Sequence, residues 1–410
     1  MKILYIIHYG FTPKEFYCDP ITNKPKKAIG DGGSNIHINL IKYLEKNKEE
    51  IVISTFKDNY LYEAFFKKSS YIKFQYFWTP FLLFKKYISF FDNIFKIFIL
   101  PIKILFSNFN YDTVVSSSDF LPDVIYSFFV KLKNPKIKWV ASFFLEAPKP
   151  WVRNNPYKIN IVRFFIGIIY WFTQLFSKYF IKKKADIVLL TSEPDIKKFV
   201  TNKRNEKSIL VVQGGVDTSS ASNYLKSEKI VPLNEREYDA CFLGRLHDQK
   251  GVLELVDIWE EVCKEKPFAK LAIIGNGHLE LKLREKIIMK NLQLNINILG
   301  FLTGKDKYDI FKKSKVIVHP AIYDSGGMSA AEAMAWGIPG VCFDLDALKT
   351  YYPKGMIKTE CFNIKKFANN ILLLLNNEDL YKKLSREALE LILENWDWNK
   401  RLSFIYSKIT

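Results

Sequence analysis

The chain has 410 residues, enough for two or three domains, and its composition excludes several classes of protein. Apolar residues make up 48% of it, too many for an intrinsically disordered chain. Its five cysteines are scattered without a C-x-x-C pair, so neither a zinc site nor a disulfide framework is predicted, and a reducing cytoplasm is the compartment that fits.

The net charge of +18 is unevenly distributed. Residues 1–200 carry 30 Lys and Arg against 16 Asp and Glu, a net charge of +14, whereas residues 201–410 carry +4. Such charge suits nucleic acid, an anionic membrane surface or a lysine-rich surface in water. The longest uncharged apolar run, 164–177, has 14 residues and is short of the roughly 20 that a spanning helix needs, so no transmembrane helix is predicted.

In the first half, short apolar runs alternate with amphipathic segments, an order typical of parallel α/β sheets. The segment 31–47 begins as a Gly-Gly loop and continues as a helix with Ile36 and Leu40 on its apolar face. A second helix is expected at 122–132. The predicted strands are 2–7, 50–56, 111–118, 137–144, 185–192 and 208–215.

A second α/β series begins near residue 238 and ends in a closing helix at 396–409, so we expect two α/β domains joined by a polar hinge within 200–235. Its predicted strands are 238–246, 269–277, 296–301 and 315–320, and its predicted helices are 251–265, 278–291, 304–313 and 328–336. The expected domain bounds are 1–205, 206–390 and, for the C-terminal helix, 391–410.

The stretch "IYDSGGMSAAEAMAWGIPG" at 322–340 reads as a glycine loop followed by a helix that Gly337 and Pro339 end. A strand precedes it, so unpaired backbone N–H groups at the helix start can bind an anion. The acids Asp324 and Glu332 flank this loop. A carboxylate of this kind accepts hydrogen bonds from vicinal hydroxyl groups.

A second glycine loop, "GRLHDQKG" at 244–251, follows another predicted strand. Ligands of open parallel sheets bind at the carboxyl ends of strands. Arg245 and Lys250 stand just past such an end, where a planar guanidinium and an ammonium suit a diphosphate. Taken alone, the pair is more typical of a solvated surface.

Together these two stretches resemble the retaining glycosyltransferases of family 4, which have the GT-B fold of two Rossmann-like domains facing a cleft. The hallmark of the family is Glu, seven residues, Glu, then Ala-Met-Ala and Gly-x-Pro; here Asp324, Glu332 and "AMAWGIP" match it. "GGSNIH" at 32–37 resembles the N-terminal Gly-Gly loop of the family. The likeness covers most of 185–410, and before that it rests on the Gly-Gly pair and the strand order.

The resemblance implies a role for each of these positions. Asp324 would contact hydroxyls of a donor sugar, the backbone amides of 326–329 would meet sugar and diphosphate, and Glu332 would hold the ribose. The implied catalytic residues are Asp324, Arg245, Lys250 and Glu332. The implied donor-binding residues are Gly33, Gly244, Arg245, Lys250, Gly326, Gly327, Met328, Ser329 and Glu332.

The chain departs from the family in two ways. Asp324 is one methylene shorter than the family's Glu, and the family's first-domain histidine is absent from "ASFFLEAPKPW" at 141–151. Glu146 either takes part of that role or is a structural acid. We expect His8 and His37 to be packed or helix-face histidines rather than catalysts.

The implied reaction moves a sugar from a UDP- or GDP-sugar to a hydroxyl with retention of configuration, without a cofactor. No Asp-x-Asp pair is placed to hold a metal, so transfer is expected to be metal-independent. The basic, aromatic segments 74–106 and 161–184 suit an interfacial helix, although buried helices are the alternative. We therefore expect a cytoplasmic protein at the inner membrane face, with an anionic membrane surface as partner, a lipid-linked glycan or glycolipid acceptor and no nucleic acid.

Three other readings stay open: a non-catalytic GT-B protein at the membrane surface, a nucleotide-sugar epimerase of the same fold, and a phosphorylase. A phosphorylase needs a pyridoxal lysine that the sequence does not place. Donor hydrolysis by the purified protein separates the transferase from the others.

Overall fold

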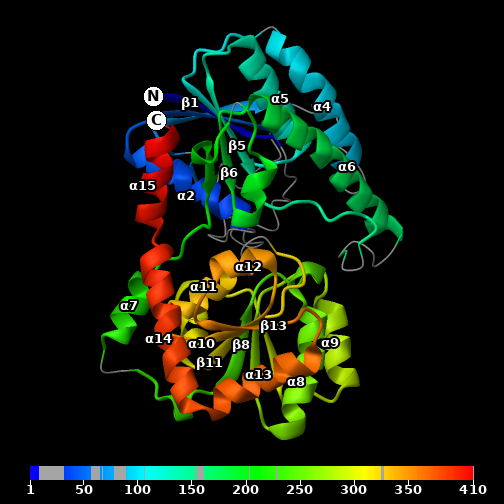
Figure 1. Cartoon of the computed structure of the whole chain (residues 1–410), viewed down its shortest axis with the longest axis vertical. Coiled ribbons are helices and arrows are strands. Elements are labelled where there is room, and N and C mark those ends of the chain that lie inside the picture. The colour runs from blue at the N-terminus through cyan, green and yellow to red at the C-terminus, as the bar shows by residue number, and fades with distance from the viewer. Residues whose placement is uncertain are drawn as a thin grey trace. The chain divides into compact units, whose positions relative to one another are not determined.

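The computed structural model describes residues 1–8, 32–56, 65–66, 68–77, 89–105, 107–152, 155, 161–202, 204–227, 230–324 and 327–409. The chain divides into two compact units (Figure 1). Unit 1 comprises Met1–Gly214 and Asn399–Thr410, and unit 2 comprises Gly215–Trp398.

Unit 1 is built on a seven-stranded parallel sheet with the order β3-β2-β1-β4-β5-β6-β7. Its strands are β1 (Lys2–Ile7), β2 (Glu50–Phe56), β3 (Ile72–Phe77), β4 (Thr113–Ser116), β5 (Lys138–Phe143), β6 (Ile187–Leu190) and β7 (Ile209–Val211). The described helices are α2 (Gly32–Lys46), α4 (Ser89–Leu105), α5 (Leu121–Lys133), α6 (Ile161–Lys184) and α15 (Trp398–Ile409), whose first residue falls in unit 2.

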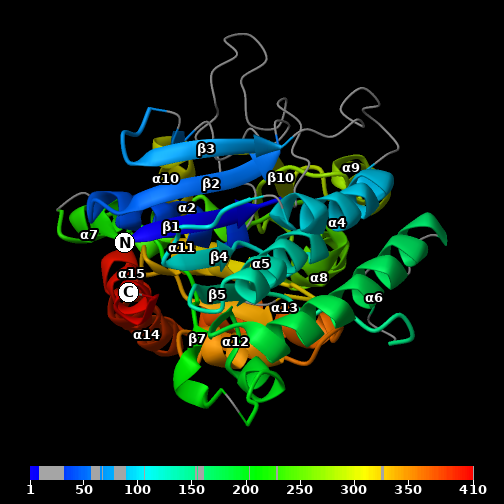
Figure 2. The ribbon, with the colours of Figure 1, turned by 90° about the horizontal axis from the view of Figure 1, so that it is seen from above.

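Alternation along β1 shows how the sheet is covered on both faces. Leu4 and Ile6 are buried in the same core as Val124 of α5. Tyr5 points to the opposite face, where its hydroxyl is hydrogen-bonded to His37 of α2. Figure 2 shows α4, α5 and α6 side by side over the first of these faces.

Unit 2 repeats this arrangement with a six-stranded parallel sheet of order β10-β9-β8-β11-β12-β13. Its strands are β8 (Tyr238–Leu243), β9 (Leu271–Ile274), β10 (Ile296–Gly300), β11 (Ser314–His319), β12 (Gly340–Phe343) and β13 (Met356–Thr359). Its helices are α7 (Ser219–Leu225), α8 (Val252–Glu265), α9 (Glu280–Met289), α10 (Gly304–Lys312), α11 (Met328–Met334), α12 (Asp346–Tyr351), α13 (Ile364–Asn376) and α14 (Glu378–Asn395).

In both sheets the strand order reverses beside the first strand, which is the doubly wound Rossmann topology. In unit 2 the reversal lies between β8 and β11. Phe242 and Val316 are buried in one core with α8, α9 and α13, whereas Cys241 and Ile317 are buried in the other with α11 and α14. The fold class expected from the sequence is therefore confirmed.

Several expected bounds shift in the structure. The boundary between the two units lies between Gly214 and Gly215 and not between residues 205 and 206. The reason is that β7 still pairs with β6 in the first sheet. At the C-terminus, α14 runs through residue 391, and the chain joins unit 1 only at Asn399.

Local structure differs from expectation at three more places. Gly32 and Gly33 begin α2 rather than forming a loop, and residues 9–31 lie outside the described part. The segment 74–106 starts in β3 and ends in α4, so it is not one helix. Strands β12 and β13 were not predicted.

Candidate functional site

The carboxyl ends of β8 and β11 flank the point where the strand order of unit 2 reverses. Loop 244–251 follows β8, and loop 320–327 follows β11. Because ligands of doubly wound sheets bind at this reversal, the two stretches singled out from the sequence meet where a site is expected. Lys250 comes from the first loop and Asp324 from the second.

Backbone contacts lock the two loops together. The carbonyl of Gln249 accepts hydrogen bonds from the N–H groups of Ile322 (3.0 Å) and Tyr323 (3.3 Å). A Cβ added to Gly251, whose φ is +63°, would lie 1.9 Å from the carbonyl oxygen of Pro320. Only glycine allows this approach, so Gly251 sets the separation of the two loops.

Lys250, Asp324 and His319 form a buried charged cluster. The Nζ of Lys250 lies 2.5 Å from Oδ2 of Asp324. Nε2 of His319 lies 3.3 Å from the same oxygen, although their alignment falls short of a hydrogen bond. The structure thus brings together the expected phosphate-binding lysine and the expected sugar-binding acid, and adds a histidine to which the sequence assigned no role.

Opposing effects set the ionisation of this cluster. Burial alone raises the pKa of the Asp324 carboxyl, but Lys250 and His319 outweigh it and hold that pKa well below its usual range. Burial, together with Lys250, lowers the pKa of His319 against the attraction of Asp324. Near neutral pH the cluster therefore contains a carboxylate and an uncharged imidazole.

The start of α11 is shaped by Gly327, whose φ is +60°. A Cβ there would lie 2.8 Å from Nε2 of His319, so the glycine makes room for the imidazole. Met328 and Ser329 follow in the first turn of α11, and the hydroxyl of Ser329 is buried without a hydrogen-bond partner among the described residues. Gly326 lies outside the described residues.

Glu332 lies further along α11 and forms an ion pair with Lys307 of α10. Sequence analysis missed Lys307. It stands in the first turn of its helix, where a cation is unfavourable for the helix dipole. No signal in the sequence singles it out, because Lys305 lies in the same turn and Asp306 is its neighbour.

Gly244 and Arg245 follow β8 directly. The N–H of Gly244 donates to the carbonyl of Ile274 at 3.0 Å, which continues the sheet into the loop. The Arg245 side chain is exposed and has no ion pair within the described ranges. The structure therefore does not bring Arg245 into the cluster of Lys250 and Asp324.

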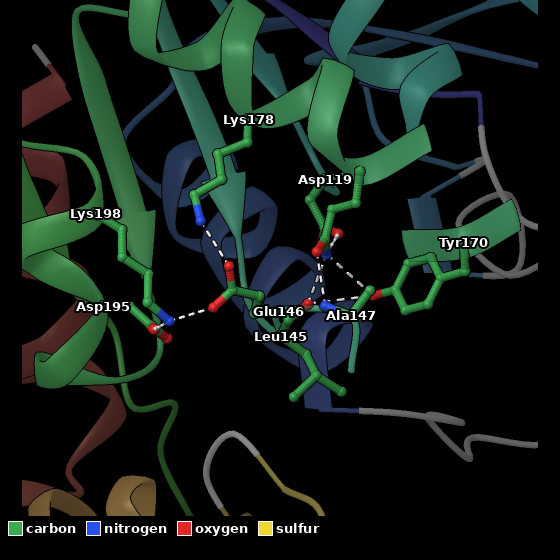
Figure 3. Close-up of polar contacts among 9 residues, drawn as sticks. Asp119, Leu145, Glu146, Ala147, Tyr170, Lys178, Asp195 and Lys198 are labelled. Atoms are coloured by element: carbon green, nitrogen blue, oxygen red, sulfur yellow. Dashed lines mark hydrogen bonds and ion pairs between the residues drawn. The ribbon is translucent and has the colours of Figure 1, made fainter. Parts of the chain in front are cut away.

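In unit 1, Gly33 lies in the first turn of α2 and Glu146 follows β5. Figure 3 shows Glu146 between Lys178 of α6 and Lys198, whose ammonium groups both donate to its carboxylate. Burial favours the neutral acid, but the two lysines outweigh it and lower the pKa of Glu146. Glu146 is therefore an ionised acid in a fixed position, not a proton donor near pH 7.

The loop that carries Glu146 is held from both sides. Gln174 donates to the carbonyl of Leu145 and to Oδ2 of Asp119, each at 2.7 Å, and accepts from the N–H of Ala147 at 2.6 Å (Figure 3). Burial raises the pKa of Asp119 to about 6, against the hydrogen bond from Gln174. The sequence did not single out Asp119 or Gln174.

His8 and His37 are both buried in unit 1. His37 contacts Tyr5 and Ser142 through its two ring nitrogens, and burial lowers its pKa to about 3. Nε2 of His8 lies 2.8 Å from the Ser54 hydroxyl, and burial lowers the pKa of His8 as well. Both are packed histidines that remain uncharged near neutral pH.

With this geometry in place, comparison with protein families is decisive for unit 2. The family model of the glycosyl transferases group 1 matches residues 224–391, which include both loops and both acids. Residues 224–391 therefore resemble the glycosyl transferases group 1.

Two curated relatives match this part of the chain. The poly(glycerol-phosphate) alpha-glucosyltransferase of Bacillus subtilis is 28% identical over 179 residues, 41% of this chain and 26% of the relative. The poly(ribitol-phosphate) alpha-N-acetylglucosaminyltransferase of Staphylococcus aureus is 28% identical over 204 residues, 48% of this chain and 38% of the relative. The chain thus spans less than half the length of these two relatives.

The fold extends the likeness to the whole chain. The structure of Anabaena Alr3699/HepE in complex with UDP and glucose matches with a TM-score of 0.66 at 14% identity, covering 100% of this chain and 99% of that one. At this identity the likeness shows the fold alone. The whole chain has the GT-B fold.

Proposed function

We propose that the protein is a retaining glycosyltransferase that moves a sugar from a nucleoside diphosphate donor to a hydroxyl acceptor. The observation that carries the proposal is the meeting of Lys250, Asp324 and His319 at the strand-order reversal of a group 1 glycosyltransferase domain. A lysine for phosphate and an ionised acid for sugar hydroxyls stand there side by side.

The donor is assigned to unit 2. Lys250 and Arg245 bind the diphosphate, with the N–H groups of Gly327, Met328 and Ser329. Asp324 accepts hydrogen bonds from hydroxyls of the sugar, and Glu332 from those of the ribose. Uracil is the first base to test, because the Anabaena structure contains UDP.

The bond between the anomeric carbon and the diphosphate oxygen breaks, and a bond to the acceptor oxygen forms on the same face. The acceptor proton passes to an oxygen of the leaving phosphate, so the step needs no separate base. Lys250, Arg245 and the helix amides stabilise the charge that builds on the diphosphate. Products of alpha configuration, as the names of both relatives state, follow from an alpha-linked donor by retention. Transfer is proposed to need no metal ion.

The acceptor is proposed to be a lipid-linked glycan or glycolipid reached at the cytoplasmic membrane face. Support comes from α6, along which Ile161, Phe165, Phe172, Phe176 and Tyr179 are exposed at helical spacing. Lys182, Lys183 and Lys184 end this helix and suit anionic headgroups.

The same helix bears on the expectation that no segment spans a membrane. Within the described chain, the segment Arg163–Lys184 is long and apolar enough to cross a membrane by length and composition, although only 22% of it is buried. Because α6 packs along α5 in unit 1, we propose that it lies in the plane of the interface instead of crossing it.

The test is donor turnover by the purified chain with UDP- and GDP-sugars, alongside thermal shift with the same nucleotides. Lys250→Ala and Arg245→Ala should each cost about 2–4 kcal/mol of transition-state stabilisation. Lys264→Ala is the matched control, because Lys264 is an exposed lysine of the same unit paired only with Glu261. Absence of both donor turnover and nucleotide binding would exclude this function, and full turnover by Lys250→Ala would remove Lys250 from the mechanism.

A further inference from the structure

Two of the five histidines of the chain converge with an acid beside the loop that carries Lys250. Nε2 of His278 lies 3.0 Å from Oδ2 of Asp248, and the rings of His247 and His278 meet edge to face with centroids 4.9 Å apart. One ligand atom from each of the three residues lies within 4.8 Å of the others. No step of the proposed transfer uses this cluster.

The three side chains stand on two loops whose backbones are locked together. The N–H of Leu246 donates to the carbonyl of Asn276 at 2.9 Å, and that of Leu279 donates to the carbonyl of Leu246 at 3.2 Å. A Cβ on Gly277 would lie 2.4 Å from the carbonyl oxygen of Leu246, so the loops approach as closely as glycine permits. The cluster therefore has a rigid base, while the half-exposed His278 can turn toward an ion.

We propose that His247, Asp248 and His278 bind a divalent transition-metal ion of the Zn²⁺ class. Two imidazoles and one carboxylate are ligands that such ions prefer, and three protein ligands leave a coordination position for water. Zn–N and Zn–O distances of about 2.0–2.2 Å require the three atoms, which lie within 4.8 Å of one another, to draw closer by small rotations of their side chains.

A metal ion would have to replace hydrogen bonds that the ligand atoms already make, and this lowers its affinity. Nδ1 of His247 accepts a 3.2 Å hydrogen bond from the N–H of Gln249, and His278 shares a hydrogen bond with Asp248. The ion takes the lone pairs that these contacts use, and the imidazole protons must shift or leave. The site is consequently a reversible one that responds to metal concentration, not a structural centre that the fold requires.

A bound ion would act on the loop that carries Lys250. His247 and Asp248 lie between Arg245 and Lys250 in the same loop. A metal bridge from this loop to His278 would hold the loop against the segment that follows β9. The inference is independent of the proposed transfer, since it rests on the ligand set and is tested without donor.

The experiment measures Zn²⁺ binding by the full-length chain carrying no polyhistidine tag. The protein is equilibrated with Zn²⁺ and passed through gel filtration, the retained metal is measured by mass spectrometry, and the dissociation constant is obtained by competition with a chromogenic chelator. We expect close to one ion per chain. His278→Gln should weaken binding by more than about tenfold, since loss even of outer-shell partners costs 10–100-fold.

Glu280→Gln is the matched control, because it removes a nearby carboxylate that pairs with Arg284 and lies outside the cluster. It should bind Zn²⁺ as the unchanged chain does. Thermal melting without metal verifies that His278→Gln is folded, and Asp248→Asn provides a second ligand variant. Equal binding by the unchanged chain and His278→Gln, or no retained ion in either, overturns the proposal.

Discussion

Single glycines decide the separation of the loops that carry the candidate site. Gly251 and Gly304 have similar backbone angles, with φ of +63° and +53°, but a Cβ would meet the Pro320 carbonyl at Gly251 and nothing within 4 Å at Gly304. Gly251→Ala should lower the stability of unit 2 by about 2–5 kcal/mol through strain and overlap. Gly304→Ala carries the strain alone and should cost about 1–2 kcal/mol. Denaturant unfolding compares the two, and equal losses would contradict the overlap.

Lys307 is the residue whose role the structure changes most. Its ion pair orients the Glu332 carboxylate, so Lys307→Met should weaken UDP binding by about tenfold, comparable to about 1–1.5 kcal/mol for a charged hydrogen bond. Calorimetry with UDP and with its 2′,3′-dideoxy analogue tests whether the loss passes through the ribose. The dideoxy analogue should lose much less affinity. Equal losses for both nucleotides would show that Lys307 acts elsewhere.

Helix α6 carries exposed apolar side chains along much of its length. Phe165 and Phe172 are each more than half exposed, and three lysines end the helix. The pair Phe165→Ser and Phe172→Ser should reduce flotation with anionic liposomes severalfold, because each buried aromatic side chain contributes about 1.5–3 kcal/mol. Changing Lys182, Lys183 and Lys184 to Glu should abolish flotation at low salt, since each charge contributes roughly 1 kcal/mol.

Leu281→Ser is the control for this prediction, because Leu281 is a highly exposed apolar residue on α9 of the other unit. It should float as the unchanged protein does. Flotation that persists in both sets of α6 variants would remove this helix from membrane binding.

Across the whole molecule, buried histidines set the response to acid. Burial lowers the pKa of His8 and His37 in unit 1 and of His319 in unit 2. These rings stay neutral in the folded chain but take up protons in the unfolded chain below about pH 6.5. Their contribution to stability is complete above that pH and is lost as the pH falls toward the folded pKa values.

Asp119 acts in the opposite direction, since its pKa of about 6 lets the folded chain take up one proton in the same range. On unfolding in this pH range, unit 1 takes up two protons on His8 and His37 and releases the one held by Asp119. Unit 2 takes up one proton, on His319. Unit 1 should therefore lose about 1 kcal/mol for each pH unit between 6.5 and 5, and the lowered pKa of His319 acts in the same direction in unit 2. Scanning calorimetry from pH 7.5 to 5 measures this, and a melting temperature that rises on acidification would contradict it.

Alternation of apolar runs with amphipathic segments was sufficient to predict two parallel α/β sheets, because buried parallel strands must be apolar and their crossover helices amphipathic. The expected strands and helices of 238–336 all appear within a few residues. The sequence failed at β3, where the residues of "IKFQYF" are largely exposed at a sheet edge and lack the apolar signature of a central strand. It also failed at β12 and β13, which are only four residues long.

The chemistry of the site divides in the same way. Asp324, Glu332 and Lys250 were singled out by their glycine loops, since such a loop after a strand places polar groups at the edge of a parallel sheet. Their roles came from the resemblance to a glycosyltransferase family. Which of them touch was decided by folding. Lys250 reaches Asp324 across 74 positions of sequence, and Lys307 reaches Glu332 across 25. Such pairings depend on strand order, which local propensity does not encode and only the packed sheet determines.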